Sequence, residues 1–237
     1  MRKQHINKIQ VEDVKDEEIN YILEEDSVII IKNSNAKINY TVNNNIKVFI
    51  LIESSNLELL YDTTSCFDLN IFSVNSSLNI ITNLNKDDLK FNYAYSTINE
   101  KSNNYKITVN HFGKNITSNI VSHGINFGNN KLSFTINAKV PFGSDGVCTN
   151  QDSKIITLNK NVATIKPNLL VDTDDVEASH SAYIGEFKEE DLFYFETRGL
   201  DKKTSEKLLA KSFLIGQMNI SFREKDMILE ILKRYWR

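Results

Sequence analysis

Residues 161–213 read NVATIKPNLLVDTDDVEASHSAYIGEFKEEDLFYFETRGLDKKTSEKLLAKSF. The first half contains a strand-like apolar run, Leu169-Leu170-Val171, followed by an acidic turn and a single histidine, His180, between two serines. The second half carries its apolar residues at helical spacing instead. The stretch therefore predicts a change from sheet to helix shortly after His180.

Upstream of this stretch, short apolar runs follow one another from residues 28–31 onward. Alternation of apolar and polar residues is visible at residues 37–42 and 69–74. Evenly spaced short strands are typical of an all-β sandwich, a barrel or a β-solenoid. The number of runs, their short spacing and the lack of Asn-Gly hairpin turns favour the solenoid, but the pattern alone leaves the sandwich open.

The chain divides into three predicted segments. Residues 1–25 form an acidic N-terminal lead-in, either a short helix or an extended segment, and residues 26–185 form the β core. Residues 186–237 are helical by pattern, with Asp201 as the expected N-cap of one helix and an amphipathic helix over residues 222–236. Gly216 is a candidate break between the two helices.

Composition excludes several classes of function. The 237 residues carry a net charge of -3, which argues against nucleic acid and anionic membranes as partners. The sequence has neither an apolar run long enough to cross a bilayer nor an apolar segment typical of a secretion signal, so a cytoplasmic location is predicted. We therefore expect Cys66 and Cys148 to be free thiols.

Several short motifs of the C-terminal half occur together in one order. They are VNH at 109–111, TSNIVS at 117–122, KPNL at 166–169, DDV at 174–176, ASHSA at 178–182, IG at 184–185, DLFYF at 191–195, TRGL at 197–200 and LLAKSF at 208–213. In this order they resemble the SufB/SufD family, the scaffold subunits of the Suf iron–sulfur cluster assembly machinery. The resemblance implies a right-handed parallel β-helix core with a short C-terminal helical region. Family members usually carry a helical N-terminal domain, so this chain resembles a reduced, core-only form.

The resemblance is to SufD rather than to SufB. SufB proteins usually have cysteines where this chain has Gln151 and Asn161. Iron–sulfur clusters are held chiefly by cysteine thiolates, so we expect no stably bound cofactor on this chain alone. The resemblance implies that His180 lies at the contact with a SufB-like subunit and serves the nascent, transient cluster as a ligand or a proton carrier. A purely structural histidine at a strand end is the alternative.

The resemblance also implies that the C-terminal helical region docks the SufC ATPase. The residues to which this role carries over are Phe193, Tyr194, Arg198, Gly199, Leu200, Leu208, Leu209 and Phe213. The alternative is that these side chains pack the helices onto the β-helix. We expect Phe193 and Phe195 to pack in this way, with parts of the helix surface left for docking.

The function predicted is that of a non-enzymatic scaffold subunit that pairs with a SufB-like subunit and recruits SufC. A homodimer is also possible. One alternative is a degenerate relative that docks SufC without building clusters, and another is an unrelated carbohydrate-binding β-helix protein. Nucleotide-binding and serine-nucleophile motifs are missing. We expect His111 and His123 to be hydrogen-bonded rather than to bind metal, and the acidic residues at 172–177 to form a solvated turn.

Overall fold

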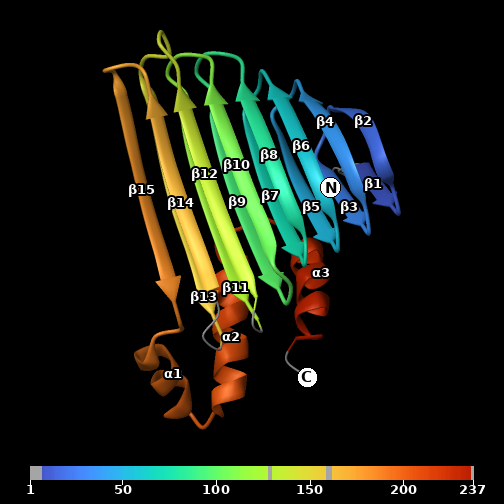
Figure 1. Ribbon diagram of the computed structural model, residues 1–237, viewed down its shortest axis with the longest axis vertical. Helices are drawn as coiled ribbons and strands as arrows, with labels where there is room; N and C mark the ends of the chain where they lie inside the picture. Colours follow the sequence, from blue (N-terminus) through green and yellow to red (C-terminus); the bar gives the residue numbers. More distant parts are fainter. Residues whose placement is uncertain (1–6, 128–129, 159–161, 236–237) are drawn as a thin grey trace, which may run out of the picture.

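A computed structural model describes residues 7–127, 130–158 and 162–235. Within these ranges the chain forms fifteen strands, followed by three helices. The strands alternate between two facing sheets, and neighbouring strands of each sheet run parallel. The predicted parallel β-helix is confirmed, and the helices lie at its lower end in the view of Figure 1.

Strands stack in chain order in both sheets. The eight-stranded sheet contains β1 (Asn7–Glu12), β3 (Ser27–Lys32), β5 (Ile46–Glu53), β7 (Phe67–Val74), β9 (Lys90–Asn99), β11 (Thr117–Asn126), β13 (Val147–Thr157) and β15 (Val176–Gly185). The seven-stranded sheet contains β2 (Lys15–Leu23), β4 (Asn35–Val42), β6 (Asn56–Thr63), β8 (Ser77–Leu84), β10 (Asn103–His111), β12 (Lys131–Val140) and β14 (Val162–Val171). The first and last coils therefore form the two ends of the β-helix.

The coils lengthen along the chain. Asn56 donates a side-chain hydrogen bond to Asn35, 21 residues earlier. The corresponding bond from Asn168 to Asn137 spans 31 residues. Because the coil length drifts, the sequence shows regular strands without a strict repeat.

Three corners between the early coils share one backbone conformation. A residue with positive φ occupies three of them: Asn33 (50°), Ser54 (51°) and Asn75 (48°). Asparagine tolerates this left-handed conformation, so it replaces glycine in a chain with few glycines. The serine after each of these residues links the corners, because the N–H of Ser34 donates to Ser55 Oγ and the N–H of Ser55 to Ser76 Oγ, both at 3.1 Å.

The interior of the β-helix is filled by inward-facing side chains of both sheets. Apolar residues dominate the early coils, where Tyr40 stacks between Tyr21 and Tyr61 at centroid distances of 5.8 and 4.8 Å. The hydroxyls of Tyr40 and Tyr61 are buried without a partner among the described residues. Later in the chain, Tyr105 donates its hydroxyl hydrogen to Tyr93 at 2.6 Å.

The β-helix starts earlier than predicted. Residues 1–25 contain β1 and β2, which pair in register with β3 and β4, so most of this segment is a coil of the core and not a lead-in. The prediction failed because the outward positions of β2 are acidic, which hides the inward pattern of Ile19, Tyr21 and Leu23. At the other end, the last strand stops at Gly185, as the motif order indicated.

Three helices follow the last strand: α1 (Glu189–Glu196), α2 (Lys202–Ile215) and α3 (Phe222–Leu232). Asp201 caps α2 as expected, since its carboxylate accepts the N–H of Thr204 at 2.7 Å. Gly216 follows α2 as its C-cap. The second predicted helix ends earlier than residue 236, which lies outside the described residues.

Helices α2 and α3 cover the outer face of the eight-stranded sheet. A second apolar cluster unites Leu214 and Ile228 of these helices with Phe49 and Phe72 of the sheet. Polar contacts reinforce this packing, because Ser96 Oγ donates to the carbonyl oxygen of Leu214 at 2.6 Å. Part of this outer face is therefore buried against helices, whereas none of the described helices lies on the outer face of the seven-stranded sheet (Figure 1).

The tyrosine hydroxyls give a test of the interior. We expect Tyr61→Phe to leave the free energy of unfolding unchanged or slightly raised, because it removes a buried hydroxyl without a partner. Tyr105→Phe should lower it by about 1–3 kcal/mol, because Tyr93 loses its hydrogen-bond partner. Urea denaturation of both variants measures the difference. Equal destabilisation by the two substitutions would contradict this account of the core.

Candidate functional site

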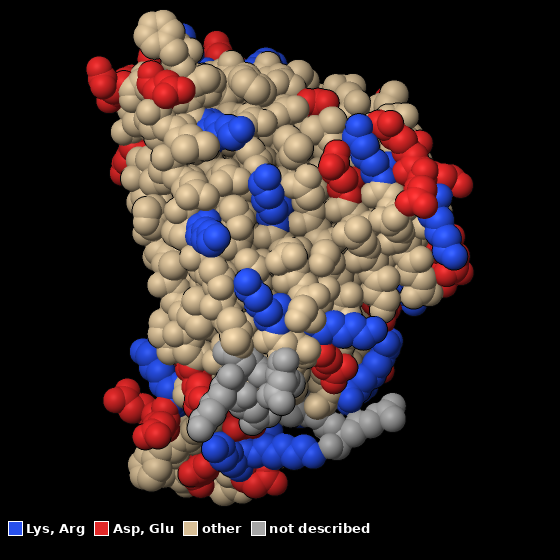
Figure 2. All heavy atoms as spheres, in the orientation of Figure 1, with Lys and Arg blue, Asp and Glu red and all other residues tan. Residues whose placement is uncertain are grey.

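The two ends of the β-helix differ in charge. At the first end, β2 exposes Lys15, Asp16, Glu17 and Glu18, and Figure 2 shows acidic side chains gathered over β2 and β4. At the other end, β15 reads VEASHSAYIG and carries one acidic residue, Glu177, and no Lys or Arg. Charged side chains on an edge strand discourage pairing with another chain. The β15 end therefore has the weaker protection against such pairing.

The outer face of β15 is tied to β13 by two side-chain bonds. Ser179 Oγ donates to Asn150 Oδ1 at 2.8 Å, and Ser181 Oγ donates to Asp152 Oδ1 at 2.5 Å. Asn150 in turn donates to Asn119 one coil earlier. These bonds fix the register of the strand immediately before and after His180.

His180 therefore points to the opposite, inner face of the sheet. Side chains alternate along a strand, and both neighbours of His180 bond on the outer face. Its partner in register is Gln151, which is 0% exposed. His180 itself is exposed, because β15 is the last strand of its sheet among the described residues. The predicted site residue thus lies at the open end of the β-helix interior.

Polar groups are concentrated in the interior of the late coils. His111 Nε2 lies 2.8 Å from Ser118 Oγ, which lies 2.7 Å from Thr149 Oγ1 one coil later. The buried Ser153 Oγ and Gln151 Oε1 have no partner among the described residues. A buried polar atom without a partner costs about 1–3 kcal/mol, so the end of the interior below His180 is polar at the expense of stability.

The second predicted surface lies on α1. Phe193 was expected to pack, and this is wrong: it is 66% exposed, because the short α1 buries no residue. Tyr194 is also exposed, and the guanidinium of Arg198 lies 4.3 Å from its ring centroid. The side chain of Phe193 and those of three glutamates are among the groups that line an open hollow. Phe195 is half-buried.

The remaining predicted docking residues divide between surface and interior. Gly199 has a φ of 83°, which favours glycine at the turn between α1 and α2. Leu208 is 38% exposed, whereas Leu200 and Leu209 are half-buried. Phe213 packs inward, since its ring stacks on His123 with centroids 4.3 Å apart. Exposed apolar surface therefore remains on Phe193, Tyr194 and Leu208.

The sequence profile described as "SUF system FeS cluster assembly, SufBD core domain" matches residues 8–213. The chain belongs to the SufB/SufD family. It is 30% identical to the iron-sulfur cluster assembly protein SufD of Bacillus subtilis over 121 residues, which are 51% of this chain and 28% of that protein. It is 26% identical to SufD of Escherichia coli over 91 residues (38% and 21%), and 49% identical to the chloroplastic protein ABCI7 of Arabidopsis thaliana over 49 residues (21% and 10%).

The matches cover less than a third of each of these relatives, but they confirm the family that the motifs indicated. The description of this family and the name of the Bacillus subtilis relative both refer to iron–sulfur cluster assembly. Of the two positions where SufB proteins usually have cysteine, Gln151 is described and Asn161 lies outside the described residues. Within the described ranges, no helix is long and apolar enough to cross a membrane.

The other polar candidates of this SufB/SufD chain have structural partners. His111 Nδ1 lies 2.9 Å from the Lys139 carbonyl oxygen, and His123 Nδ1 lies 2.8 Å from that of Phe213. The two cysteines are free and half-buried. No group of three or more His, Cys, Asp or Glu in the described part of the chain is placed to hold a metal ion.

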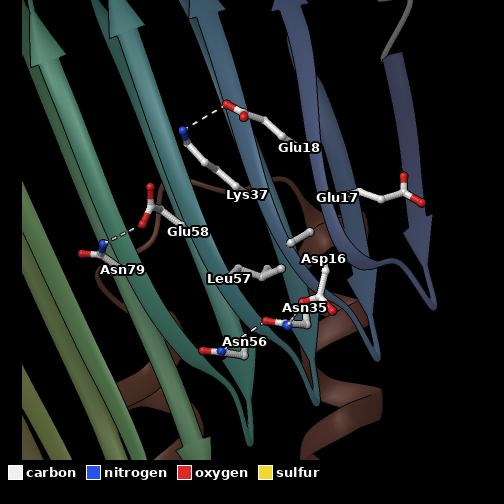
Figure 3. Close-up of a pocket in the computed structure, with 10 residues that line it drawn as sticks. Asp16, Glu17, Glu18, Asn35, Lys37, Asn56, Leu57, Glu58 and Asn79 are labelled. Atoms are coloured by element: carbon white, nitrogen blue, oxygen red, sulfur yellow. Dashed lines mark hydrogen bonds and ion pairs between the residues drawn. The ribbon is translucent and has the colours of Figure 1, made fainter.

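The first coils carry an open hollow on the outer face of β2, β4, β6 and β8 (Figure 3). Its polar side chains pair with each other across coils: Lys37 with Glu18 at 3.0 Å, and Asn79 with Glu58 at 3.3 Å. Asn35 donates to Asp16 at 2.6 Å in the same way. These contacts link neighbouring coils on the surface of the β-helix. They do not point to a common centre, as the side chains of a ligand site would.

Two histidines should make the free energy of unfolding of this chain depend on pH. Burial lowers the pKa of His111 and of His123, so the folded chain holds both in the neutral form. The free energy of unfolding is then complete above the unfolded-state pKa of about 6.5 and falls as the pH drops below it, because the unfolded chain binds more protons.

We expect a loss of at most about 1.4 kcal/mol per histidine for each pH unit below this value. Urea denaturation at several pH values above and below it measures the loss. His111→Gln and His123→Gln should each flatten the profile. A stability that does not change over this range would contradict the assignment.

Proposed function

We propose that this chain is a SufD-like, non-catalytic scaffold subunit of an iron–sulfur cluster assembly complex. In this proposal it pairs with a SufB-like subunit through its β15 end and recruits a SufC-like ATPase through its helices, in the cytoplasm. One observation carries the proposal: His180 faces the open end of the interior on β15, which in the described part of the chain pairs with β13 along one edge only. Membership in the family supplies the chemistry.

The β15 edge is suited to pairing with another β-structure. Small uncharged side chains flank His180: Ala178, Ser179, Ser181 and Ala182. An unpaired strand presents a row of backbone donors and acceptors to any chain that can add a strand. The charged β2 end lacks this character, so a partner should bind at one end only.

The cluster is cargo in this proposal, held transiently between two subunits. His180 would supply a neutral imidazole nitrogen, which is a suitable ligand for iron and a proton carrier near neutral pH. Thiolates would come from the partner, because the register partner of His180 is Gln151 and not a cysteine. Cys148 lies on β13, the strand that carries Gln151, but its partner in register on β15 is Glu177, three residues before His180.

The SufC-like ATPase would bind the exposed surface of α1 and α2. Aromatic and arginine side chains are enriched among residues that dominate interface energies. Phe193, Tyr194 and Arg198 are exposed together on and directly after α1, with acidic residues around them. A partner with a basic rim around an apolar pocket would be complementary to this surface.

A second function remains in competition with this proposal. A degenerate relative would bind SufC without building clusters, and the glutamine at position 151, where SufB proteins usually have a thiol, favours it. A homodimer through β15 would place two His180 residues at one interface without thiolates beside them. Reconstitution of cluster assembly separates these alternatives.

His180→Ala tests the proposed role. The chain should remain folded, since the side chain is exposed at the end of the β-helix. Cluster formation by the complex reconstituted with a SufB-like subunit, a SufC-like ATPase, iron and a sulfur donor should fall by about ten-fold or more. The absorbance of the assembled cluster under anaerobic conditions measures the yield.

Lys106→Ala is the matched control, because Lys106 is exposed on the outer face of β10, away from both proposed interfaces. It should assemble clusters at the unchanged rate. A normal yield from His180→Ala would remove the role of this histidine and favour the degenerate relative.

The helical surface is tested by Phe193→Ala and Leu208→Ala. Each should weaken binding of the SufC-like ATPase by about 2 kcal/mol, or roughly thirty-fold, because each removes exposed apolar surface from the proposed interface. Isothermal titration calorimetry measures the affinity. Phe142→Ala is the control, since Phe142 is 91% exposed in the turn after β12, at a different part of the β-helix. Unchanged affinity of both helix variants would place the ATPase elsewhere.

A further inference from the structure

Gln151 is a buried residue whose hydrogen bonding is incomplete. It lies on β13 and is 0% exposed, between the outward-facing Asn150 and Asp152. Its Nε2 donates to the carbonyl oxygen of Asn168 on β14 at 3.2 Å. Its Oε1 is buried and has no partner among the described residues. The bond from Nε2 fixes which side of the amide carries the free acceptor.

The residue one coil further on is His180. The two Cα atoms pair in register between β13 and β15. The bonds from Ser179 to Asn150 and from Ser181 to Asp152 hold both neighbours of His180 on the outer face. In-register residues of parallel strands stack on the same face, with strands about 4.8 Å apart. The imidazole of His180 and the amide of Gln151 are therefore stacked neighbours on the inner face.

The chemistry of the two groups is complementary. A neutral imidazole has one N–H donor and one nitrogen with a free lone pair, and the group bonded to the N–H decides which nitrogen is free. Gln151 Oε1 accepts hydrogen bonds and needs one. Histidines that bind metal commonly donate their other ring N–H to an oxygen acceptor, which fixes the orientation of the ring.

We propose that Gln151 is a positioning residue for His180. In the structure the two groups are not hydrogen-bonded, but His180 is exposed, and rotation of its imidazole about the side-chain bonds would bring a ring N–H to Oε1. In this arrangement Oε1 accepts the ring N–H, which holds the imidazole in one tautomer and turns the lone pair of the other nitrogen toward the open end of the β-helix. This inference rests on the proposed function for the use of that lone pair, but the hydrogen bond itself is a property of the isolated chain.

A structural explanation of Gln151 makes a different prediction. If a buried water satisfies Oε1, the imidazole is unconstrained and Gln151 only fills the interior. Ser153 is the matched comparison, because its hydroxyl is also buried without a partner on the same strand. Its partner in register is Ala182, which has no side-chain donor. Ser153→Ala should therefore leave His180 unaffected.

The test is nitrogen-15 nuclear magnetic resonance of the full chain at about pH 8. Loss of the signal in His180→Ala assigns the ring nitrogens of His180. We expect a single tautomer and a ring N–H that exchanges slowly with solvent. Gln151→Met, which keeps the volume and removes the acceptor, should give two tautomers in exchange and lose the slow N–H. Ser153→Ala should keep the wild-type spectrum.

Two results would overturn the proposal. The first is a wild-type spectrum with mixed tautomers and a rapidly exchanging N–H, which needs no variant and is decisive even if Gln151→Met fails to fold. The second is an unchanged spectrum in a folded Gln151→Met. Neither depends on cluster assembly, so positioning of His180 can hold even if His180→Ala assembles clusters normally, in which case the proposed function fails alone.

Discussion

Each interior strand of this β-helix depends for its backbone hydrogen bonds on the strands one coil earlier and one coil later. Parallel strands in register satisfy both edges of each interior strand, and the side-chain ladders of asparagine and serine repeat the same register on the surface. The two ends differ from the interior, because β1, β2, β14 and β15 each have only one neighbouring strand among the described residues. The acidic surface at the first end and the polar interior at the last end are both features of these terminal coils.

The two ends carry side chains of different character. The first end carries acidic side chains on β2 that pair with residues of the following coils, as Glu18 does with Lys37. The last end has small uncharged residues on its edge and a polar interior beneath it. Stability alone would favour an apolar interior in every coil, because buried polar atoms without partners are costly. Two of the buried polar atoms without partners, Gln151 Oε1 and Ser153 Oγ, lie on β13, the strand directly beneath β15.

Much of this could be predicted from the sequence. Alternating runs gave the strands, and the order of motifs such as ASHSA and TRGL gave the family, because these residues are read without knowing any contact. Asp201 was found as a cap because capping is local. By contrast, β2 was missed because its acidic outer residues dominate the composition, and the exposure of Phe193 was missed because burial of a helix depends on what packs against it.

The sequence by itself determined the β-helix class, the helical C-terminal region and the family, since local pattern and motif order carry that information. Only the tertiary structure decided which face of β15 carries His180 and what lies beneath it. The reason is that the register between coils brings together Gln151 and His180, which are separated in the chain by a turn, a strand and a second turn. Residues in register one coil apart are separated by 19 residues between β2 and β4 and by 31 between β12 and β14, so no fixed spacing in the sequence could have revealed that pair.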